Sequence, residues 1–208
     1  MLFRSVPVPF DSKADYLVGG IGNDIFIVNE SIDTVMETAS GGNDTIQSSW
    51  IDIDLLYYLG VENIEFTGKA DLKGTGSQQA NEVTGNRGAN SLFGKGGKDT
   101  LQGGDGADVL TGGAGADVFK FVSAAECGSG TKRDSIADFQ TGVDKIDLGA
   151  FIAGGSLVIA GGFTGVAGQV LFRAATGNLF GDVNGDAIID FSISLVGITS
   201  VQVADFLF

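Results

Sequence analysis

Apolar positions recur every nine residues between residues 76 and 120. From Gly76 the chain reads GSQQANEVT, GNRGANSLF, GKGGKDTLQ, GGDGADVLT and GGAGADVFK, and the eighth position of each repeat is apolar. The last three residues of each repeat are typical of a short strand with one inward side chain, and the first six of a turn. The apolar positions are Val83, Leu92, Leu101, Leu110 and Phe119. A fixed short period of this kind predicts an all-β stack of similar coils.

Polar positions follow the same period. The first position of each repeat is glycine, and the sixth is Asn81, Asn90, Asp99, Asp108 or Asp117. A weaker form of the pattern occurs earlier in the chain, where GGIGNDIFI is a complete repeat beginning at Gly19. There the sixth position falls on Asp15, Asp24, Asp33 and, after an insertion of two residues, Asp44. We therefore expect two repeat segments in one chain.

The remaining segments lack the glycine–aspartate loop. Residues 48–75 alternate apolar and polar positions, which favours further coils or a bridge without metal. After Lys120 the period stops, and the apolar runs between Gly, Asn and Asp predict an antiparallel β cap that covers the open end of the stack. Helical periodicity is scarce, with one turn expected at Ser123 to Glu126. The expected units are a leader or remnant at 1–13, a degenerate roll segment at 14–48, bridging coils at 49–75, a nonapeptide roll at 76–120 and a cap at 121–208.

The composition excludes several classes of function. The chain has no histidine, which excludes histidine-dependent catalytic triads and histidine-ligated zinc. It has 26 acidic and 12 basic residues, so we expect no nucleic-acid partner, because phosphate binding requires a basic surface. No apolar run approaches the length of a membrane span, so we expect no membrane insertion. Hydrophobic residues make up 43% of the chain, which is enough for a packed core.

Glycine and aspartate at this spacing indicate a calcium site. Glycine adopts the left-handed backbone conformations that a tight turn needs, and it lets main-chain carbonyls face into the loop. Ca²⁺ takes six to eight oxygen ligands from carboxylates and carbonyls, more than one loop supplies. In a two-sheet roll, loops 18 residues apart lie on the same side and stack. The expected pairs are Asp99 with Asp117, Asn90 with Asp108, Asn81 with Asp99, Asp15 with Asp33 and, roughly, because two residues are inserted, Asp24 with Asp44.

The candidate metal ligands lie in the loops richest in glycine and aspartate. In the second repeat segment they are Asn90, Gly94, Gly96, Gly97, Asp99, Gly103, Gly104, Gly106, Asp108, Gly112, Gly113, Ala114, Gly115 and Asp117. In the first segment they are Asp15, Gly20, Gly22, Asp24, Asp33 and Asp44. The alternative for each aspartate is an Asx turn that hydrogen-bonds only its own backbone. Stacked carboxylates would nevertheless repel one another without a cation between them, which favours the metal site.

These nonapeptides resemble the RTX, or haemolysin-type, calcium-binding repeats. GADVF at 115–119, RDSIADF at 133–139 and DKIDL at 144–148 are similar to the C-terminal module of serralysin-type secreted metalloproteases. DVNGD at 182–186, DFSI at 190–193 and VADFLF at the chain end are similar to the same module. The resemblance covers residues 14–48 and 76–208.

The resemblance implies a parallel β-roll with several bound Ca²⁺ ions and export to the extracellular space by type I (ABC transporter) secretion machinery. It implies that Asp134 and Asp138 complete calcium sites at the last coil, the alternative being that they cap turns. It also implies that Asp205, Phe206, Leu207 and Phe208 belong to an uncleaved secretion signal. The sequence has no HExxH motif and no histidine to build one, so we expect a non-enzymatic module.

One motif in the cap has two interpretations. Asp182, Asn184, Asp186 and Asp190 have the spacing of an EF-hand loop. The sixth position of that loop is Ala187 rather than glycine, and the twelfth is Ile193 rather than glutamate, which argues against an EF-hand. Asn184-Gly185 instead favours a type I′ hairpin turn between two strands, with a weak extra calcium site as the alternative.

A polysaccharide-binding role is the second candidate function. Modules that resemble this chain accompany alginate epimerases, so an extracellular polysaccharide is a candidate partner. Aromatic residues such as Trp50, Tyr57 and Tyr58 are candidates to stack on sugars, although such residues more often belong to a core or cover a sheet.

Overall fold

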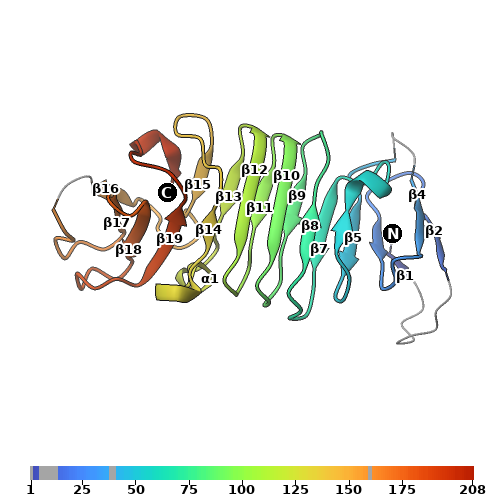
Figure 1. The fold of residues 1–208 in the computed structure, drawn as a ribbon, viewed down its shortest axis with the longest axis horizontal. Coiled ribbons are helices and arrows are strands. Elements are labelled where there is room, and N and C mark those ends of the chain that lie inside the picture. Colours follow the sequence, from blue (N-terminus) through green and yellow to red (C-terminus); the bar gives the residue numbers. More distant parts are fainter. Residues whose placement is uncertain (1, 5–13, 38–40, 159–160) are drawn as a thin grey trace.

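The computed structural model describes residues 2–4, 14–37, 41–158 and 161–208. Short strands follow one another coil by coil along the long axis of the molecule and form two long sheets that face each other (Figure 1). Every neighbouring pair in the first long sheet is parallel. Its strands are, in spatial order, β1 (Leu2–Arg4), β3 (Ile25–Ile27), β5 (Thr45–Ser48), β7 (Asn63–Phe66), β9 (Glu82–Thr84), β11 (Thr100–Gln102), β13 (Val118–Lys120), β15 (Lys145–Asp147) and β20 (Phe206–Leu207).

The second long sheet forms the opposite wall. Its strands are, in spatial order, β16 (Ser156–Val158), β17 (Gln169–Arg173), β18 (Asn178–Asp182), β19 (Phe191–Leu195), β14 (Ser135–Ile136), β12 (Val109–Gly115), β10 (Ser91–Gly97), β8 (Lys73–Thr75) and β6 (Ile53–Asp54). A small parallel sheet of β2 (Tyr16–Val18) and β4 (Thr34–Met36) lies at the N-terminal end. The predicted all-β parallel roll is therefore confirmed.

The nine-residue period sets the register of the coils. Leu101 pairs with Val83 on one side and with Phe119 on the other, each 18 residues away. All three side chains are completely buried. A strand of three residues turns its middle side chain to one face and its neighbours to the other, so one apolar residue per repeat is enough to fill the core. The stack of these residues forms a single column of hydrophobic contacts between the two long sheets.

The C-terminal cap is antiparallel in only part of its sheet. β17 pairs with β18 and β18 with β19 in antiparallel fashion, as predicted. β14 pairs with β19 and β16 with β17 in parallel fashion, and β20 pairs with β15 of the first long sheet in parallel fashion, contrary to the antiparallel cap expected from the sequence. A four-residue turn, 174–177, joins β17 to β18 and allows a hairpin, whereas β19 and β20 reach their partners after long excursions of the chain.

The predicted tight turn at Asn184-Gly185 is wrong. The antiparallel hairpin of β18 and β19 exists, but residues 183–190 form a long loop between the strands. A type I′ turn requires positive φ at both central residues, whereas Gly185 and Ala187 have positive φ and Asn184 does not. Asp182 shapes the loop instead, because its two carboxylate oxygens accept the amides of Gly185 at 2.7 Å and Ala187 at 2.9 Å.

Helical segments are short in the described part of the chain. The expected turn is α1 (Ala124–Cys127), and the hydroxyl of Ser123 caps its N-terminus by accepting the amide of Glu126. The other segments are the 3-10 turns η1 (Leu55–Tyr57), η2 (Gly130–Lys132) and η3 (Val203–Asp205). Among the described residues, no helix has the length and apolar character needed to span a membrane.

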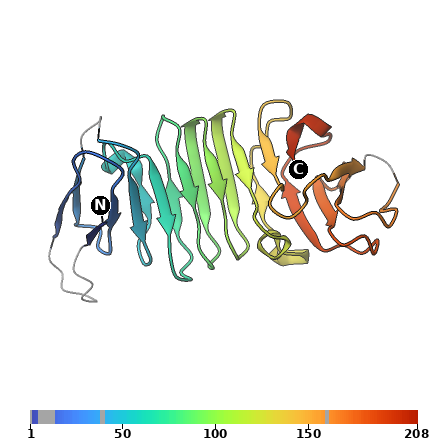
Figure 2. The ribbon, with the colours of Figure 1, turned by 180° about the vertical axis from the view of Figure 1, so that it is seen from behind.

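The second wall of the roll is interrupted near the N-terminus. β6 and β4 are not hydrogen-bonded, so the small sheet of β2 and β4 stands apart from the second long sheet (Figure 2). Ile53 follows Val35 by 18 residues, which is the spacing of a regular coil. The chain leaves β6 after two residues because Asp54 accepts the amide of Leu56 at 3.0 Å and starts the turn η1. Residues of β4 and β6 line a groove between the two edges.

Candidate metal centre

The aspartates at the sixth repeat position form hydrogen-bonded ladders along the roll. The main-chain amide of Asn81 donates to Oδ1 of Asp99 at 2.8 Å, and the amide of Asp99 donates to Oδ1 of Asp117 at 2.9 Å. On the opposite side, the amide of Asn90 donates to Oδ1 of Asp108 at 2.7 Å. The structure thus brings together the residue pairs expected from the spacing of 18. The ladders place successive carboxylates in line between stacked loops.

The second oxygen of five ladder carboxylates is buried and has no hydrogen-bond donor. These oxygens are the Oδ2 atoms of Asp44, Asp99, Asp108, Asp117 and Asp134. Their residues are at most 1% exposed. Leaving a buried charged oxygen without a partner is costly, and native proteins avoid it. Oxygen ligands of this kind suit a hard cation such as Ca²⁺, so the donor set fits the ion expected from the sequence.

Backbone conformation separates two classes of loop. Residues at positions two and four have positive φ in loop 94–99 (Lys95, Gly97), loop 103–108 (Gly104, Gly106) and loop 112–117 (Gly113, Gly115), as they do at Gly20 and Gly22. Loops 76–81 and 85–90 do not share this pattern. There the side-chain oxygens of Asn81 and Asn90 accept the amides of Ser77 at 2.6 Å and Asn86 at 2.8 Å. An internal amide thus takes the oxygen that stays unpartnered in the glycine-rich loops.

Glycine at the first repeat position makes room for the carboxylate. A Cβ atom added at Gly94 or Gly103 would lie 2.3 Å from Oδ2 of Asp99 or Asp108, and one at Gly112 would lie 2.4 Å from Oδ2 of Asp117. No real side chain tolerates such a contact with a buried carboxylate. The glycines therefore keep each unpartnered oxygen in a cradle within its own loop.

Burial and neighbouring carboxylates disfavour the charged form of these groups. Burial raises the pKa of Asp99 to about 6, of Asp108 to about 7 and of Asp134 to about 8. Burial also raises the pKa of Asp117, with a further increase from the nearby Asp138. Hydrogen bonds from main-chain amides oppose these shifts but do not cancel them. A bound cation would reverse the effect by favouring the ionised carboxylates.

The ladder continues beyond the regular repeats. Asp134 is fully buried and accepts the amide of Asp108 at 2.8 Å, 26 residues earlier. Asp144 accepts the amide of Asp117 at 3.1 Å, and Glu62 accepts that of Asp44 at 2.9 Å. Asp144 and Glu62 are ladder members that the nonapeptide period does not predict. The spacing could have indicated Glu62, because it follows Asp44 by 18 residues. It was not a candidate because it is a glutamate and the residues before it do not form a glycine-rich loop.

Other predicted residues have their oxygens occupied by amides. Asp138 accepts the amides of Gly112 at 2.9 Å and Gly113 at 2.8 Å, so both of its oxygens cap the loop 112–117. Asp33 accepts the amide of Asp15 at 3.1 Å, as the expected pairing requires. Its other oxygen accepts amides from the loop just before it, those of residues 29 and 30.

The C-terminal residues pack against the last coil. Asp205 is fully buried and accepts the amides of Gly142 at 2.8 Å and Gln202 at 2.9 Å. Phe206 stacks on Phe208 with ring centroids 5.6 Å apart. Leu207 pairs with Asp147 of β15, so the tail forms the last strand of the first long sheet.

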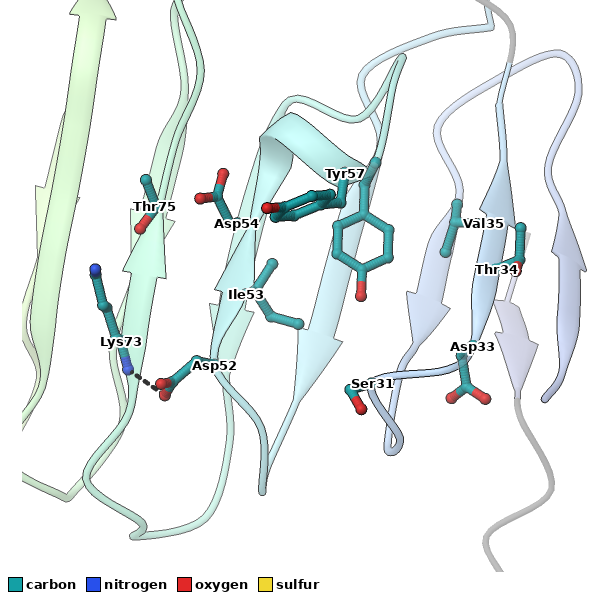
Figure 3. A pocket seen from close by; sticks show the side chains of 11 residues that line it. Ser31, Asp33, Thr34, Val35, Asp52, Ile53, Asp54, Tyr57, Lys73 and Thr75 are labelled. Carbon is teal, nitrogen blue, oxygen red and sulfur yellow. Dashed lines mark hydrogen bonds between the residues drawn. The ribbon is translucent and has the colours of Figure 1, made fainter. Parts of the chain in front are cut away.

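The groove between β4 and β6 is the second structural feature with binding potential. It has a volume of about 540 Å³. Figure 3 shows Asp52, Asp54 and Lys73 on one side of it, Thr34 and Val35 on the other. The side chain of Tyr57 is 78% exposed at the groove, and Tyr58 is buried in its lining. Polar groups and an aromatic face therefore share one open surface.

Comparison with known proteins identifies the family. A family model described as "Peptidase M10 serralysin C terminal" matches residues 10–208. The chain belongs to the serralysin C-terminal family. It is 40% identical to Serralysin A of Dickeya chrysanthemi over 77 residues, and 37% identical to the metallopeptidase AprA of Pseudomonas marginalis over 73 residues. These segments cover 35% and 33% of this chain but only 16% and 15% of the relatives.

Solved structures extend the comparison to other members of this fold. This serralysin C-terminal module is similar to the AlgE6R2 subunit of the mannuronan C5-epimerase of Azotobacter vinelandii, with a TM-score of 0.51 and 30% identity. The match covers 69% of this chain and 92% of the subunit. The AlgE6R3 subunit matches with a TM-score of 0.47 and 26% identity over 69% of this chain and 79% of the subunit.

Proposed function

We propose that this chain is a non-enzymatic calcium-binding module whose folding depends on Ca²⁺ and supports type I secretion of an extracellular protein. The observation that carries the proposal is the row of buried Oδ2 atoms without a hydrogen-bond donor. Membership of the serralysin C-terminal family supports it. The ligands of the main sites would be Asp99, Asp108, Asp117 and Asp134 together with carbonyls of the glycine-rich loops.

Calcium would supply the charge that the loops lack. Without it, buried carboxylates repel one another, and 34 glycines raise the entropic cost of ordering the chain. The chain then stays extended and suitable for export. Extracellular calcium-binding modules have dissociation constants of about 10⁻⁴–10⁻³ M, so millimolar calcium outside the cell fills the sites. Because the ion binds only the folded loops, its binding drives folding by mass action.

The C-terminal tail is the segment that we propose the exporter recognises. Asp205 and Phe206 are buried in the folded roll, so these two residues of the tail are accessible to a receptor only before the last coil forms. Export would therefore precede folding. Deleting residues 204–208 should abolish secretion by type I machinery, whereas a deletion of equal length in the turn region 161–165 should not.

Circular dichroism in the far ultraviolet during a Ca²⁺ titration tests the main proposal. We expect little β signal in EDTA and a cooperative gain of β structure as calcium is added, with Mg²⁺ at the same concentration as the control. A complete β spectrum in EDTA that calcium does not change would refute calcium-dependent folding.

A polysaccharide is the second candidate ligand, and the groove between β4 and β6 favours it. An exposed tyrosine ring beside carboxylates and a lysine is a typical surface for a sugar chain. The similarity to an epimerase subunit supports this choice. Titration with alginate oligosaccharides should show binding that Tyr57→Ala weakens at least about tenfold and that Val203→Ala, an exposed position at the opposite end of the roll, leaves unchanged. Equal binding by both variants would reject the groove as the site.

A further inference from the structure

Three carboxylates from different segments converge near the N-terminal end of the roll. Oxygen atoms of Asp24, Glu37 and Asp44 all lie within 4.8 Å of one another. Asp24 and Asp44 end two glycine-rich loops that stack on each other, since the amide of Asp24 donates to Oδ1 of Asp44 at 2.7 Å. Glu37 directly follows β4 and occupies no sixth position of the repeat. Its carboxylate is therefore one that the sixth-position aspartates of the repeat do not provide.

The surrounding loop is shaped around the side chain of Glu37. The amide of Gly20 donates to both carboxylate oxygens of Glu37 at 3.2 Å. A Cβ atom added at Gly19 would lie 1.8 Å from Oε2 of Glu37, and one at Gly41 would lie 2.4 Å from Oε1. The same position at Gly41 is 2.7 Å from the carbonyl oxygen of Gly20. Because Gly19 and Gly41 have no side chains, the carboxylate of Glu37 fits beside the carbonyl oxygen of Gly20.

Asp44 independently indicates that this space takes a cation. Asp44 is fully buried, and its Oδ2 has no hydrogen-bond donor, although its Oδ1 has one. Asp24 is 3% exposed, so the almost completely buried carboxylates of Asp24 and Asp44 lie next to that of Glu37. Negative groups at this distance repel one another, and a divalent ion between them would offset that repulsion. An unpartnered buried oxygen beside two further carboxylates is the donor set of a hard divalent cation.

We propose that Asp24, Glu37 and Asp44 form a Ca²⁺ site in which Glu37 is a ligand that the glycine–aspartate repeat itself does not supply. This inference rests on the proposed function and extends it to a specific site. Asp44 follows Asp24 by 20 residues rather than 18, so the second loop lacks the regular spacing. Glu37 follows Gly19 by 18 residues and so occupies a first position of the repeat, where the later repeats have glycine. Its side chain reaches the amide of Gly20 in the stacked loop. Three carboxylates also give this site a higher charge than the two-carboxylate pair of Asp99 and Asp117, and ligand charge tunes calcium affinity.

Isothermal titration of the whole chain with Ca²⁺ tests the assignment through Glu37→Gln. Glutamine keeps an oxygen that accepts the amide of Gly20, so a merely structural role would survive the substitution. We expect the variant to lose one bound ion or to bind that ion at least about tenfold more weakly, with the other sites unchanged. Glu82→Gln is the matched control, because Glu82 is exposed on β9 and lies outside the cluster. Unchanged stoichiometry and affinity in Glu37→Gln would overturn the inference.

Hydrogen exchange of the unmodified protein supplies a second test that does not depend on a variant. Calcium should slow exchange in residues 19–25 and 41–45, as it does in the loops 94–99 and 112–117. Protection of the latter loops alone would reject the site at Glu37 and leave the proposed function intact. A chain that binds no calcium at all would reject the proposed function itself.

Discussion

The main-chain amide of Asp99 donates a 2.9 Å hydrogen bond to Oδ1 of Asp117, one full coil further along the chain. The same carboxylate leaves its Oδ2 buried without a donor. One oxygen therefore fixes the register of two loops, and the other is available to an ion. This division of roles repeats along the ladder and leads to testable expectations.

Asp108→Asn should affect the metal-free and calcium-bound forms in opposite directions. The substitution removes a buried charge, so in EDTA the variant should fold more readily than the unmodified protein. With saturating calcium it should be less stable by about 1–3 kcal/mol, because an anionic ligand is lost. Urea unfolding in EDTA and in calcium measures both effects. Asp105→Asn, in the same loop but exposed, is the control and should change neither; an equal loss in both media would argue against a ligand role.

Lys95→Gly should stabilise the calcium-bound roll by about 1 kcal/mol. Lys95 has φ of 82°, a conformation that costs an ordinary residue about 1–2 kcal/mol and glycine almost nothing. Repeats further along the chain have glycine at this position, Gly104 and Gly113. Urea unfolding at saturating calcium measures the gain. Lys98→Gly is the matched control and should lower stability slightly, since Lys98 has no positive φ to relieve.

Leu101→Ala should destabilise the roll by about 2–5 kcal/mol, the usual cost of a large cavity in a packed core. Leu101 is completely buried between Val83 and Phe119 on neighbouring strands. Because folding and binding are coupled, the calcium concentration at the folding midpoint should rise. Val109→Ala, which changes a 41% exposed side chain, should leave that midpoint nearly unchanged. Similar midpoints for both variants would contradict a continuous core.

Calcium affinity should increase with pH up to about 8. The pKa values of Asp99, Asp108 and Asp134 are raised to about 6, 7 and 8 in the folded, metal-free chain. A group with a raised folded pKa stabilises the fold at low pH, and this contribution is lost as pH rises through that value. In EDTA, acidification from pH 8 to pH 5 should therefore favour β structure, as circular dichroism can show.

Protons and calcium compete for the same oxygens, so the two effects have opposite signs. Below the pKa of Asp134, calcium affinity at its site should fall on the order of tenfold per pH unit. Calcium titrations at pH 6, 7 and 8 measure this slope. An affinity independent of pH over this range would show that these carboxylates do not bind the ion.

The nonapeptide period predicts the roll, its register and most of its ladder. One buried residue in each nine, such as Leu101, can satisfy a core only if successive strands alternate between two sheets. This alternation places residues 18 apart side by side, so the pairs of Asp99 with Asp117 and Asn90 with Asp108 followed from spacing alone. Glycine-rich turns between the strands were likewise expected, but not which of their residues are left-handed, since Lys95 has positive φ and Gly88 does not.

Where the spacing changes, the contacts along the ladder depend on tertiary packing rather than on the period. Asp144 reaches the ladder at an offset of 27 residues, and Asp134, expected at a calcium site only from the family resemblance, reaches it at 26. The pair of Asp24 and Asp44 was expected despite the insertion of two residues, and it forms at a spacing of 20. An insertion can loop out in many ways, so no period reveals which side chain returns to the stack. The entry of Glu37 beside Gly20, and the early turn at Asp54 that opens the groove, are contacts of this kind. They depend on how irregular segments pack against coils already in place, and local sequence does not encode that packing.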